Sequence, residues 1–214
     1  MEDSILNSIK SALAKGDRNG VVKVVKEALD KGLDVKTILE EGLIASMNAI
    51  GKKFKNNEIF IPEVLIAAKA MHSGIAVLEP LFAASGIKPV GKVVIGTVKG
   101  DLHDIGKNIV SMMLKGACFQ IMDLGIDVPP GKFVEIVQTN GADIIAMSSL
   151  LTTSMGAMRD TIKLLKESGL RDKVKIIVGG APVTQSFADS IGADGYAKDA
   201  ATAVDKAKEL LKKL

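Results

Sequence analysis

The sequence of 214 residues predicts an α/β fold in two parts, a four-helix bundle followed by a doubly wound sheet of five parallel strands. Three observations carry this prediction. The chain shows only helical periodicity up to about residue 84, then a connector with Gly86, Pro89 and Gly91, and then short β-branched runs that alternate with helical stretches. Strands that alternate with helices favour a parallel sheet with helices on both faces, as in Rossmann-like folds of the flavodoxin type. We therefore predict domains over residues 1–88 and 89–214.

Four helices are expected in the first domain. One begins near Pro62, and its apolar residues recur at steps of three and four, at Val64, Ala68, Met71, Ile75, Leu78 and Phe82. An upstream helix follows Asp34, a suitable N-cap, with its apolar face at Val35, Ile38, Leu39, Leu43, Met47, Ile50 and Phe54. Two shorter helices end at Gly16 and Gly32. Four helices with short loops predict a small bundle.

Five strands are expected in the second domain, over Lys92–Val98, Cys118–Asp123, Asp143–Ser148, Val174–Val178 and Gly195–Ala197. The helices are expected over Ile105–Lys115, Lys132–Asn140, Ser154–Ser168, Pro182–Ile191 and Ala200–Leu214. Cys118, the single cysteine, is expected to be a buried strand residue. In a doubly wound sheet, ligands bind beyond the carboxyl ends of the strands, and the residues considered next all follow strands.

Charge and hydropathy argue against several classes of partner. The formal net charge is only +3, and basic residues alternate with acidic ones along stretches such as Lys206 to Lys213, so nucleic acid is not an expected partner. Met1 to Lys10 lacks the basic start and apolar run of a signal peptide. No stretch has the roughly 18 uninterrupted apolar residues of a membrane helix. A cytoplasmic location without a membrane partner is expected.

A histidine lies in the loop after the first predicted strand, in the segment Gly100-Asp101-Leu102-His103-Asp104-Ile105-Gly106. A metal-binding histidine commonly presents one ring nitrogen to the metal while a carboxylate holds the other, so His103 would be the ligand and Asp101 its orienting group. The loop by itself supports equally a histidine that binds no metal and only caps a helix or makes hydrogen bonds. Asp123 and Asp127 are interpreted as loop and cap residues.

The shortage of other ligands narrows the kind of metal. With two histidines and one cysteine, the chain does not readily assemble a structural zinc site or a three-histidine catalytic one. A single protein ligand suits a metal already held by a macrocycle, as in haem or a corrinoid. Aromatic residues make up only 3% of the chain, which favours the amide-fringed corrin over haem.

Three motifs together resemble a known family. Asp101-x-His103-x-x-Gly106, Ser148-x-Leu150 and Gly179-Gly180 resemble the cobalamin-binding domain of methionine synthase and of the corrinoid proteins of methanol, methylamine and methoxyarene methyl transfer. The segments Met47–Phe54 and Phe60–Val64 resemble the helical cap of the same family. The similarity spans nearly the whole chain. It implies a cobalamin or related corrinoid cofactor that alternates between methyl-cobalt(III) and cobalt(I).

The resemblance also implies roles for individual residues. In this family the benzimidazole tail of the cofactor leaves the cobalt and enters a pocket in the sheet domain, so that the histidine, here His103, becomes the lower axial ligand. Ser154 would extend a hydrogen-bond relay from His103 through Asp101. The other residues implied to bind the cofactor are Gly100, Leu102, Asp104 and Gly106 in the histidine loop, Ser148, Leu150, Gly179 and Gly180 around the tail, Thr152 and Ala200 at the corrin edge or nucleotide loop, and Phe54 and Ile61 over the upper face. Thr153 stands where the synthase has proline, so the path of that loop is left open.

The resemblance implies a methyl carrier that is not catalytic alone. Its partners would be a substrate-specific methyltransferase, a methyl-acceptor methyltransferase and a reductive activase. Two alternatives are considered. The small subunit of an adenosylcobalamin mutase shares the histidine loop but generally lacks the cap with Phe54 and Ile61, and a cobalamin sensor usually adds a DNA-binding or signalling segment. The methyl donor is not identified by the sequence.

Overall fold

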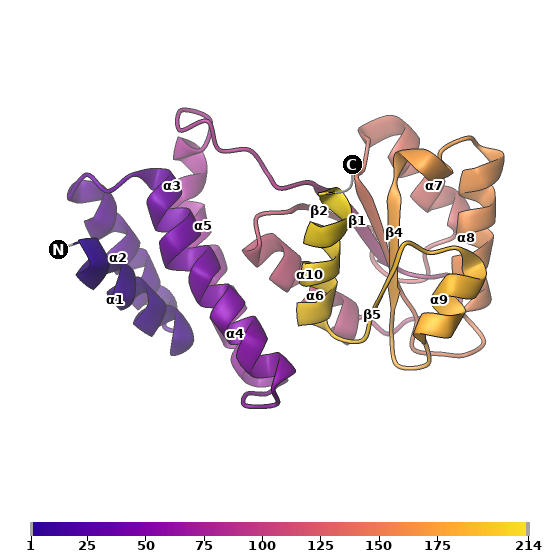
Figure 1. The fold of residues 1–214 in the computed structure, drawn as a ribbon, viewed down its shortest axis with the longest axis horizontal. Coiled ribbons are helices and arrows are strands. Elements are labelled where there is room, and N and C mark those ends of the chain that lie inside the picture. Colours follow the sequence, from indigo (N-terminus) through magenta and orange to yellow (C-terminus); the bar gives the residue numbers. More distant parts are fainter. Residues whose placement is uncertain (1, 213–214) are drawn as a thin grey trace. The chain divides into compact units, whose positions relative to one another are not determined.

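The computed structural model describes residues 2–212 and divides into two compact units (Figure 1). The first unit contains the chain up to Pro89 together with Lys115–Cys118, and the second contains Val90–Leu114 together with the chain from Phe119 onward. The first is helical and the second is an α/β unit, as the sequence predicts.

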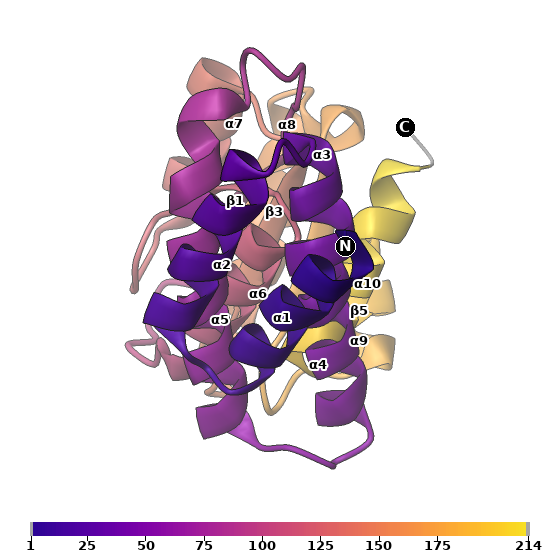
Figure 2. The ribbon, with the colours of Figure 1, turned by 90° about the vertical axis from the view of Figure 1, so that its left-hand side faces the viewer.

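The helical unit contains the predicted bundle (Figure 2). Its elements are α1 (Glu2–Ala14), α2 (Arg18–Asp30), α3 (Val35–Thr37), the π-helix η1 (Ile38–Ile44), α4 (Ala45–Lys55), α5 (Ile61–Leu78) and the 3-10 helix η2 (Glu79–Leu81). The elements α3, η1 and α4 follow one another directly and form the single helix predicted after Asp34, whose side chain accepts the backbone N–H of Lys36 and Thr37. Gly74 lets α5 approach α2, because a Cβ at Gly74 would lie 2.8 Å from Val21.

The last helix of the bundle ends earlier than predicted. The periodicity extends to Phe82, but α5 ends at Leu78 and a 3-10 turn follows. Pro80 lies in that turn, and a proline has no N–H with which to continue the α-helical bonding. The stretch Ile61–Leu81 is the one described helical segment with the length and apolar composition of a membrane span. A core helix passes the same test, and α5 buries Val64 and Met71, so the stretch is weak evidence for a membrane segment.

The second unit contains five parallel strands in the order β2-β1-β3-β4-β5. Their bounds are β1 (Lys92–Thr97), β2 (Gln120–Asp123), β3 (Ile144–Ser148), β4 (Lys175–Gly179) and β5 (Gly195–Ala197). The register pairs Thr97 with Ser148, Ser148 with Gly179, and Gly179 with Ala197. These four residues therefore lie in one row at the carboxyl edge of the sheet. The chain order reverses between β1 and β3, which is where ligands bind in such sheets.

Helices cover both faces of the sheet, with α6 and α10 on one side and α7, α8 and α9 on the other (Figure 1). The bounds are α6 (Ile105–Gly116), α7 (Pro130–Asn140), α8 (Gly156–Glu167), the 3-10 helix η3 (Arg171–Lys173), α9 (Gln185–Ile191) and α10 (Ala200–Leu211). The core on the α7–α9 side joins Phe133, Met158 and Ile145, all fully buried or nearly so. The doubly wound five-stranded prediction is thus confirmed.

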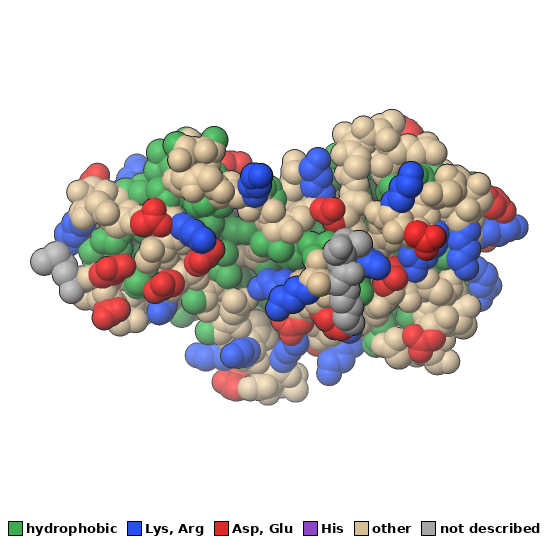
Figure 3. Space-filling model, turned by 45° about the horizontal axis from the view of Figure 1, so that its top comes forward, with side chains coloured by type: hydrophobic (Ala, Val, Ile, Leu, Met, Phe, Trp, Pro, Cys, Tyr) green, Lys and Arg blue, Asp and Glu red, His purple; other side chains and the backbone are tan. Residues whose placement is uncertain are grey.

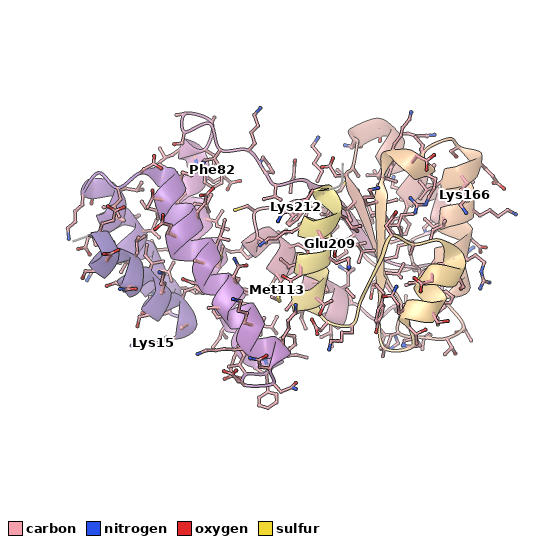
Figure 4. The ribbon with its side chains drawn as sticks, viewed as in Figure 1. Lys15, Phe82, Met113, Lys166, Glu209 and Lys212 are labelled. Atoms are coloured by element: carbon pink, nitrogen blue, oxygen red, sulfur yellow. The ribbon has the colours of Figure 1, made fainter. Side chains whose placement is uncertain are left out.

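Charged side chains are distributed over the surface. Basic and acidic groups both occur on each unit in the face shown in Figure 3. Lys166 on α8 and Glu209 on α10 are both exposed, and both are labelled in Figure 4.

Several predicted bounds are wrong for local reasons. Cys118 is half-buried and has a positive φ of 63°, because α6 ends in a turn in which the Cys118 N–H donates to Lys115, and β2 begins only at Gln120. Helix α8 begins at Gly156 because Ser154 lies in the preceding turn. Helix α9 begins after Thr184, which caps it. The predicted end of the last helix at Leu214 falls outside the described residues.

Candidate functional site

A buried carboxylate, that of Asp101, is the centre of the site. It lies after β1 with no exposed surface, and its two oxygens face five donors. Oδ1 accepts the backbone N–H of His103 at 3.0 Å and lies 2.8 Å from His103 Nδ1. Oδ2 accepts the backbone N–H of Leu150 at 2.6 Å and of Leu151 at 3.1 Å, and it accepts the hydroxyl of Ser154 at 3.1 Å. Loops after β1 and β3 therefore meet on one side chain.

These contacts decide the protonation of the pair. Burial by itself raises the pKa of the Asp101 carboxyl, but the backbone N–H groups of His103 and Leu150, the His103 ring and the Leu151 N–H lower it, and the net pKa is well below the usual range. An ionised carboxylate only accepts hydrogen bonds, so His103 Nδ1 must carry the proton. In the neutral ring the lone pair is then on Nε2, which has no hydrogen-bond partner among the described residues.

The position of the ring suits a ligand. The His103 side chain is 53% exposed although its partner Asp101 is buried. Leu102 and Leu150 lie in the loops that meet at Asp101, Ile105 begins α6, and their side chains are between 44% and 73% exposed. A Cβ added at Gly106 would have no neighbour within 4 Å. The exposed ring and the exposed apolar side chains near it in the chain are consistent with a large planar ligand.

The backbone of the histidine loop is also held. The hydroxyl of Thr97, buried at the end of β1, donates to the carbonyl oxygen of His103 at 2.9 Å. Gly100 has a φ of 84°, and its N–H donates to Asp127 Oδ1 at 2.7 Å. The Asp127 N–H donates to the carbonyl oxygen of Asp101 at 3.0 Å. Asp127, which the sequence analysis interprets as a loop or cap residue, is thus also bound to the histidine loop.

The predicted relay continues to a residue that the sequence reasoning missed. The structure brings His103, Asp101 and Ser154 together, and Ser149 Oγ lies 2.7 Å from Ser154 Oγ. Both serines are buried. The only sequence signal for Ser149 and Thr97 is that each is a hydroxyl residue at or just after a strand end.

The two predicted glycines after β4 have a structural cause of their own. A Cβ at Gly179 would lie 2.7 Å from the carbonyl oxygen of Ala197, and one at Gly180 would lie 1.8 Å from that of Ser149. Gly180 also has a φ of 125°. Both glycines let neighbouring backbone segments approach closely at the carboxyl edge, where Ser148 pairs with Gly179.

The other residues predicted to bind the cofactor lie in several different elements. Asp104 accepts the side-chain amide of Asn108 at 2.9 Å. Thr152 is exposed in the turn before α8, and Ala200 is buried at the start of α10. Phe54 on α4 and Ile61 at the start of α5 belong to the helical unit, so their covering role stays a prediction.

A buried lysine adjoins the histidine loop and was not singled out in the sequence. Lys107 in the first turn of α6 is 3% exposed, and its ammonium lies 2.5 Å from Asp123 Oδ2 and 2.7 Å from Asn108 Oδ1. Asp123 also accepts the N–H of Gly125 through Oδ1. Asp123 is therefore an ion-pair partner as well as a turn residue.

Within residues 2–212, no three side chains of His, Cys, Asp or Glu gather closely enough to hold a metal ion by themselves. The family comparison identifies the ligand class. A B12 binding domain model matches residues 91–205, and a second model of the same description matches residues 5–79. The chain belongs to the B12-binding corrinoid proteins.

Relatives of this corrinoid protein match it almost from end to end. A dimethylamine corrinoid protein of Methanosarcina barkeri is 47% identical over 212 residues, which cover 98% of this chain and 99% of the relative. A corrinoid protein of Desulfitobacterium hafniense (strain Y51) is 43% identical over 213 residues, with 98% and 99% covered. The predicted family and its cobalamin or related corrinoid cofactor are thereby confirmed.

Solved structures agree with the fold of the corrinoid protein. The crystal structure of a cobalamin-binding protein from D. hafniense DCB-2 superimposes with a TM-score of 0.82 at 32% identity, covering 96% of this chain and 98% of that one. The methanol:cobalamin methyltransferase complex MtaBC from M. barkeri has a chain that superimposes with a TM-score of 0.87 at 30% identity, covering 99% of this chain and 81% of that one.

Proposed function

We propose that this corrinoid protein carries a methyl group on cobalt between a substrate-specific methyltransferase and a second, methyl-accepting methyltransferase, with His103 as the lower axial ligand. The observation that carries the proposal is the five-donor environment of Asp101. It keeps the carboxylate ionised, which fixes the proton of His103 on Nδ1 and leaves the lone pair on Nε2 of a half-exposed ring. The corrinoid, when bound, supplies the metal that accepts and gives up the methyl group.

The residues at the carboxyl edge of the sheet fit a corrinoid whose own base has left the metal. We assign the space beyond β3 and β4 to the cofactor tail, with Ser148, Leu150, Gly179 and Gly180 as its lining. Two adjacent glycines put backbone rather than side chains there. Thr152 and Ala200 would contact the corrin edge or the nucleotide loop, because they follow β3 and β5, the strands on either side of β4.

We assign the protection of the opposite face of the corrinoid to the helical domain of residues 1–88. Phe54 ends α4, Ile61 begins α5, and only a short loop separates them. The two apolar side chains therefore lie at the same end of the bundle, and Ile61 is 43% exposed. An apolar lid would exclude water from the methyl group, and it would have to move aside for each partner.

The partner proteins are inferred from the relatives. The MtaBC structure is a complex with a methyltransferase, and four relatives at 45–47% identity are named dimethylamine corrinoid proteins. We infer a methylamine-type donor system and a protein that is not catalytic alone. A reductive activase and a cytoplasmic location complete the proposal. A mutase subunit or a sensor is less supported, since the relatives that match 98% of this chain are named corrinoid proteins, and several of them dimethylamine corrinoid proteins.

The ligand role is tested by electron paramagnetic resonance of the full chain loaded with cob(II)alamin. A ring nitrogen bound below the metal splits the signal, so the splitting from the protein should be present in the wild type and absent in His103→Ala. Labelling the protein with [15N]histidine distinguishes His103 from the cofactor's own base, because only a histidine ligand changes the splitting pattern. An unchanged pattern in both tests would refute His103 as the ligand.

The carrier role needs a second experiment. The loaded protein is reduced and mixed with dimethylamine and a dimethylamine methyltransferase while the cobalt absorption bands are followed. Formation of the methylated band, and its loss on addition of a methyl-accepting methyltransferase, is the expected result. Methylation with monomethylamine or methanol systems instead would change the donor assignment, and no methylation with any of them would contradict the carrier role.

A further inference from the structure

We propose that Asp127 is a positioning residue for His103 and that the segment from Asp123 to Val128 clamps the histidine loop over the end of β1. The inference rests on the proposed role of His103 as the lower ligand. It concerns how the loop is held in place, which the relay through Asp101 and Ser154 does not explain.

The first argument is the reciprocal bonding around one peptide. Asp127 Oδ1 accepts the N–H of Gly100 at 2.7 Å, and the Asp127 N–H donates to the carbonyl oxygen of Asp101 at 3.0 Å. One bond holds the Gly100 N–H, just before the Gly100–Asp101 peptide, and the other holds the Asp101 C=O, just after it. The peptide between them is a rigid plane. The side chain that orients His103 projects from this plane. Asp127 thus fixes the backbone from which Asp101 reaches the imidazole.

The second argument is backbone conformation. Asp127 has a φ of 52°, one of three positive values among the described residues other than glycine. Such conformations are disfavoured for a residue with a Cβ and persist where surrounding contacts determine them. At Asp127 those contacts are the two bonds to the histidine loop. Aspartate and asparagine tolerate this region better than most residues, so the residue type suits both tasks.

The third argument is that the rest of the clamp is anchored to β1. The Thr97 N–H donates to the Gly125 carbonyl at 3.0 Å, and the Val128 N–H donates to the Thr97 carbonyl at 2.9 Å. At the other end, Asp123 holds the buried ammonium of Lys107, just after the histidine loop. The loop is therefore bound by the same segment before and after His103. A loop held at both ends leaves the histidine to move mainly by its side chain.

The experiment compares three variants of the full chain loaded with cob(II)alamin. Asp127→Gly keeps the backbone conformation and the N–H to Asp101 but removes the acceptor for Gly100. Asp127→Asn keeps an acceptor and the tolerance of positive φ. Asp172→Gly, at an exposed position in η3, is the matched control for the same chemical change. The histidine nitrogen splitting is recorded as the pH is lowered, because protons compete with the metal for the ring nitrogen.

Losing one hydrogen bond of ordinary strength should lower the ratio of bound to released His103 about fivefold. The pH at which half of the splitting is lost should then rise by about 0.7 in Asp127→Gly. It should stay within about 0.3 of the wild type in Asp127→Asn and be unchanged in Asp172→Gly. Circular dichroism melting of each variant shows whether it is folded under the conditions used.

The outcomes separate this inference from the proposed function. No histidine splitting in the wild type would overturn both. Normal splitting in the wild type with an unshifted midpoint in folded Asp127→Gly would overturn only the role of Asp127. If Asp127→Gly does not fold, the test rests on Asp127→Asn. A rise of about 0.7 in the midpoint pH of Asp127→Asn would then overturn the view that position 127 needs only a hydrogen-bond acceptor and tolerance of a positive φ.

Discussion

Replacing Asp101 with asparagine should reverse the proton arrangement on His103. The amide has one acceptor and one donor end, and the structure decides which end faces which partner. Oδ2 meets two backbone N–H groups and the Ser154 hydroxyl, whereas Oδ1 meets one backbone N–H and the His103 ring. Placing the NH2 at the Oδ2 position would orphan two backbone donors, and placing it at the Oδ1 position would orphan one. The NH2 should therefore point toward His103.

The free-energy cost to metal binding by His103 follows from that orientation of the amide. With an NH2 group opposite it, His103 Nδ1 becomes the acceptor and the proton moves to Nε2, the nitrogen needed for the metal. Binding then requires the other tautomer, whose Nδ1–H would face the amide N–H without an acceptor, at a cost of about 1.5–3 kcal/mol. This corresponds to a loss of about 10- to 100-fold in the ratio of bound to released His103. Substitutions of groups that orient metal ligands commonly have effects of this size.

The assay is the nitrogen splitting of the cob(II)alamin-loaded protein as a function of pH. At a pH where the released ring is neutral, the ratio of bound to released His103 in Asp101→Asn should be about 10- to 100-fold below that of the wild type. Asp34→Asn is the matched control, because Asp34 also accepts two backbone N–H groups and asparagine caps a helix as well as aspartate does. A ratio of bound to released His103 in Asp101→Asn equal to that of the wild type would refute the tautomer argument.

Three further predictions concern stability of the apoprotein, measured by urea unfolding. The ionised Asp101 stabilises the fold above about pH 4, the usual aspartate pKa in an unfolded chain, and this contribution is lost as the pH falls through the lower pKa of the folded state. The wild type should therefore lose more unfolding free energy than Asp101→Asn below about pH 4. Gly180→Ala should cost about 3 kcal/mol or more, because its Cβ meets the Ser149 carbonyl oxygen and its φ is 125°. Lys107→Met should cost about 1–2 kcal/mol, since it unpairs Asp123, whose side chain is 34% exposed and thus partly solvated.

The predictions for Gly180→Ala and Lys107→Met each have a control in the same unit. Gly131→Ala places a Cβ in open space on α7 and should cause no loss of stability. Lys132→Met breaks an exposed pair with Glu135 and should cost less than about 0.5 kcal/mol. If a buried change and its exposed control lowered the unfolding free energy equally, the assigned contacts would be contradicted. The same would follow if the unfolding free energies of the wild type and Asp101→Asn fell in parallel as the pH is lowered.

Local patterns in the sequence were sufficient for the architecture. The five strands are predicted to within about two residues, because a buried strand reads as a short β-branched run whatever it packs against. The pair Asp101 and His103 is also local, since a carboxylate two residues before a histidine can reach its ring in a loop. Cys118 shows the limit of such patterns. It lies in an apolar run, but the left-handed turn that ends α6 keeps it out of β2.

The sequence by itself determined the α/β class, the order of the elements and the histidine loop, because these depend on periodicity and on neighbours in the chain. Only the tertiary structure decided how that loop is held. The N–H groups of Leu150 and Leu151 that keep Asp101 ionised, and the Asp127 clamp, come from the ends of other strands, 49 residues away in the case of Leu150. A backbone donor has no side-chain signature, so its role becomes visible only when parallel strands bring their carboxyl ends to one edge.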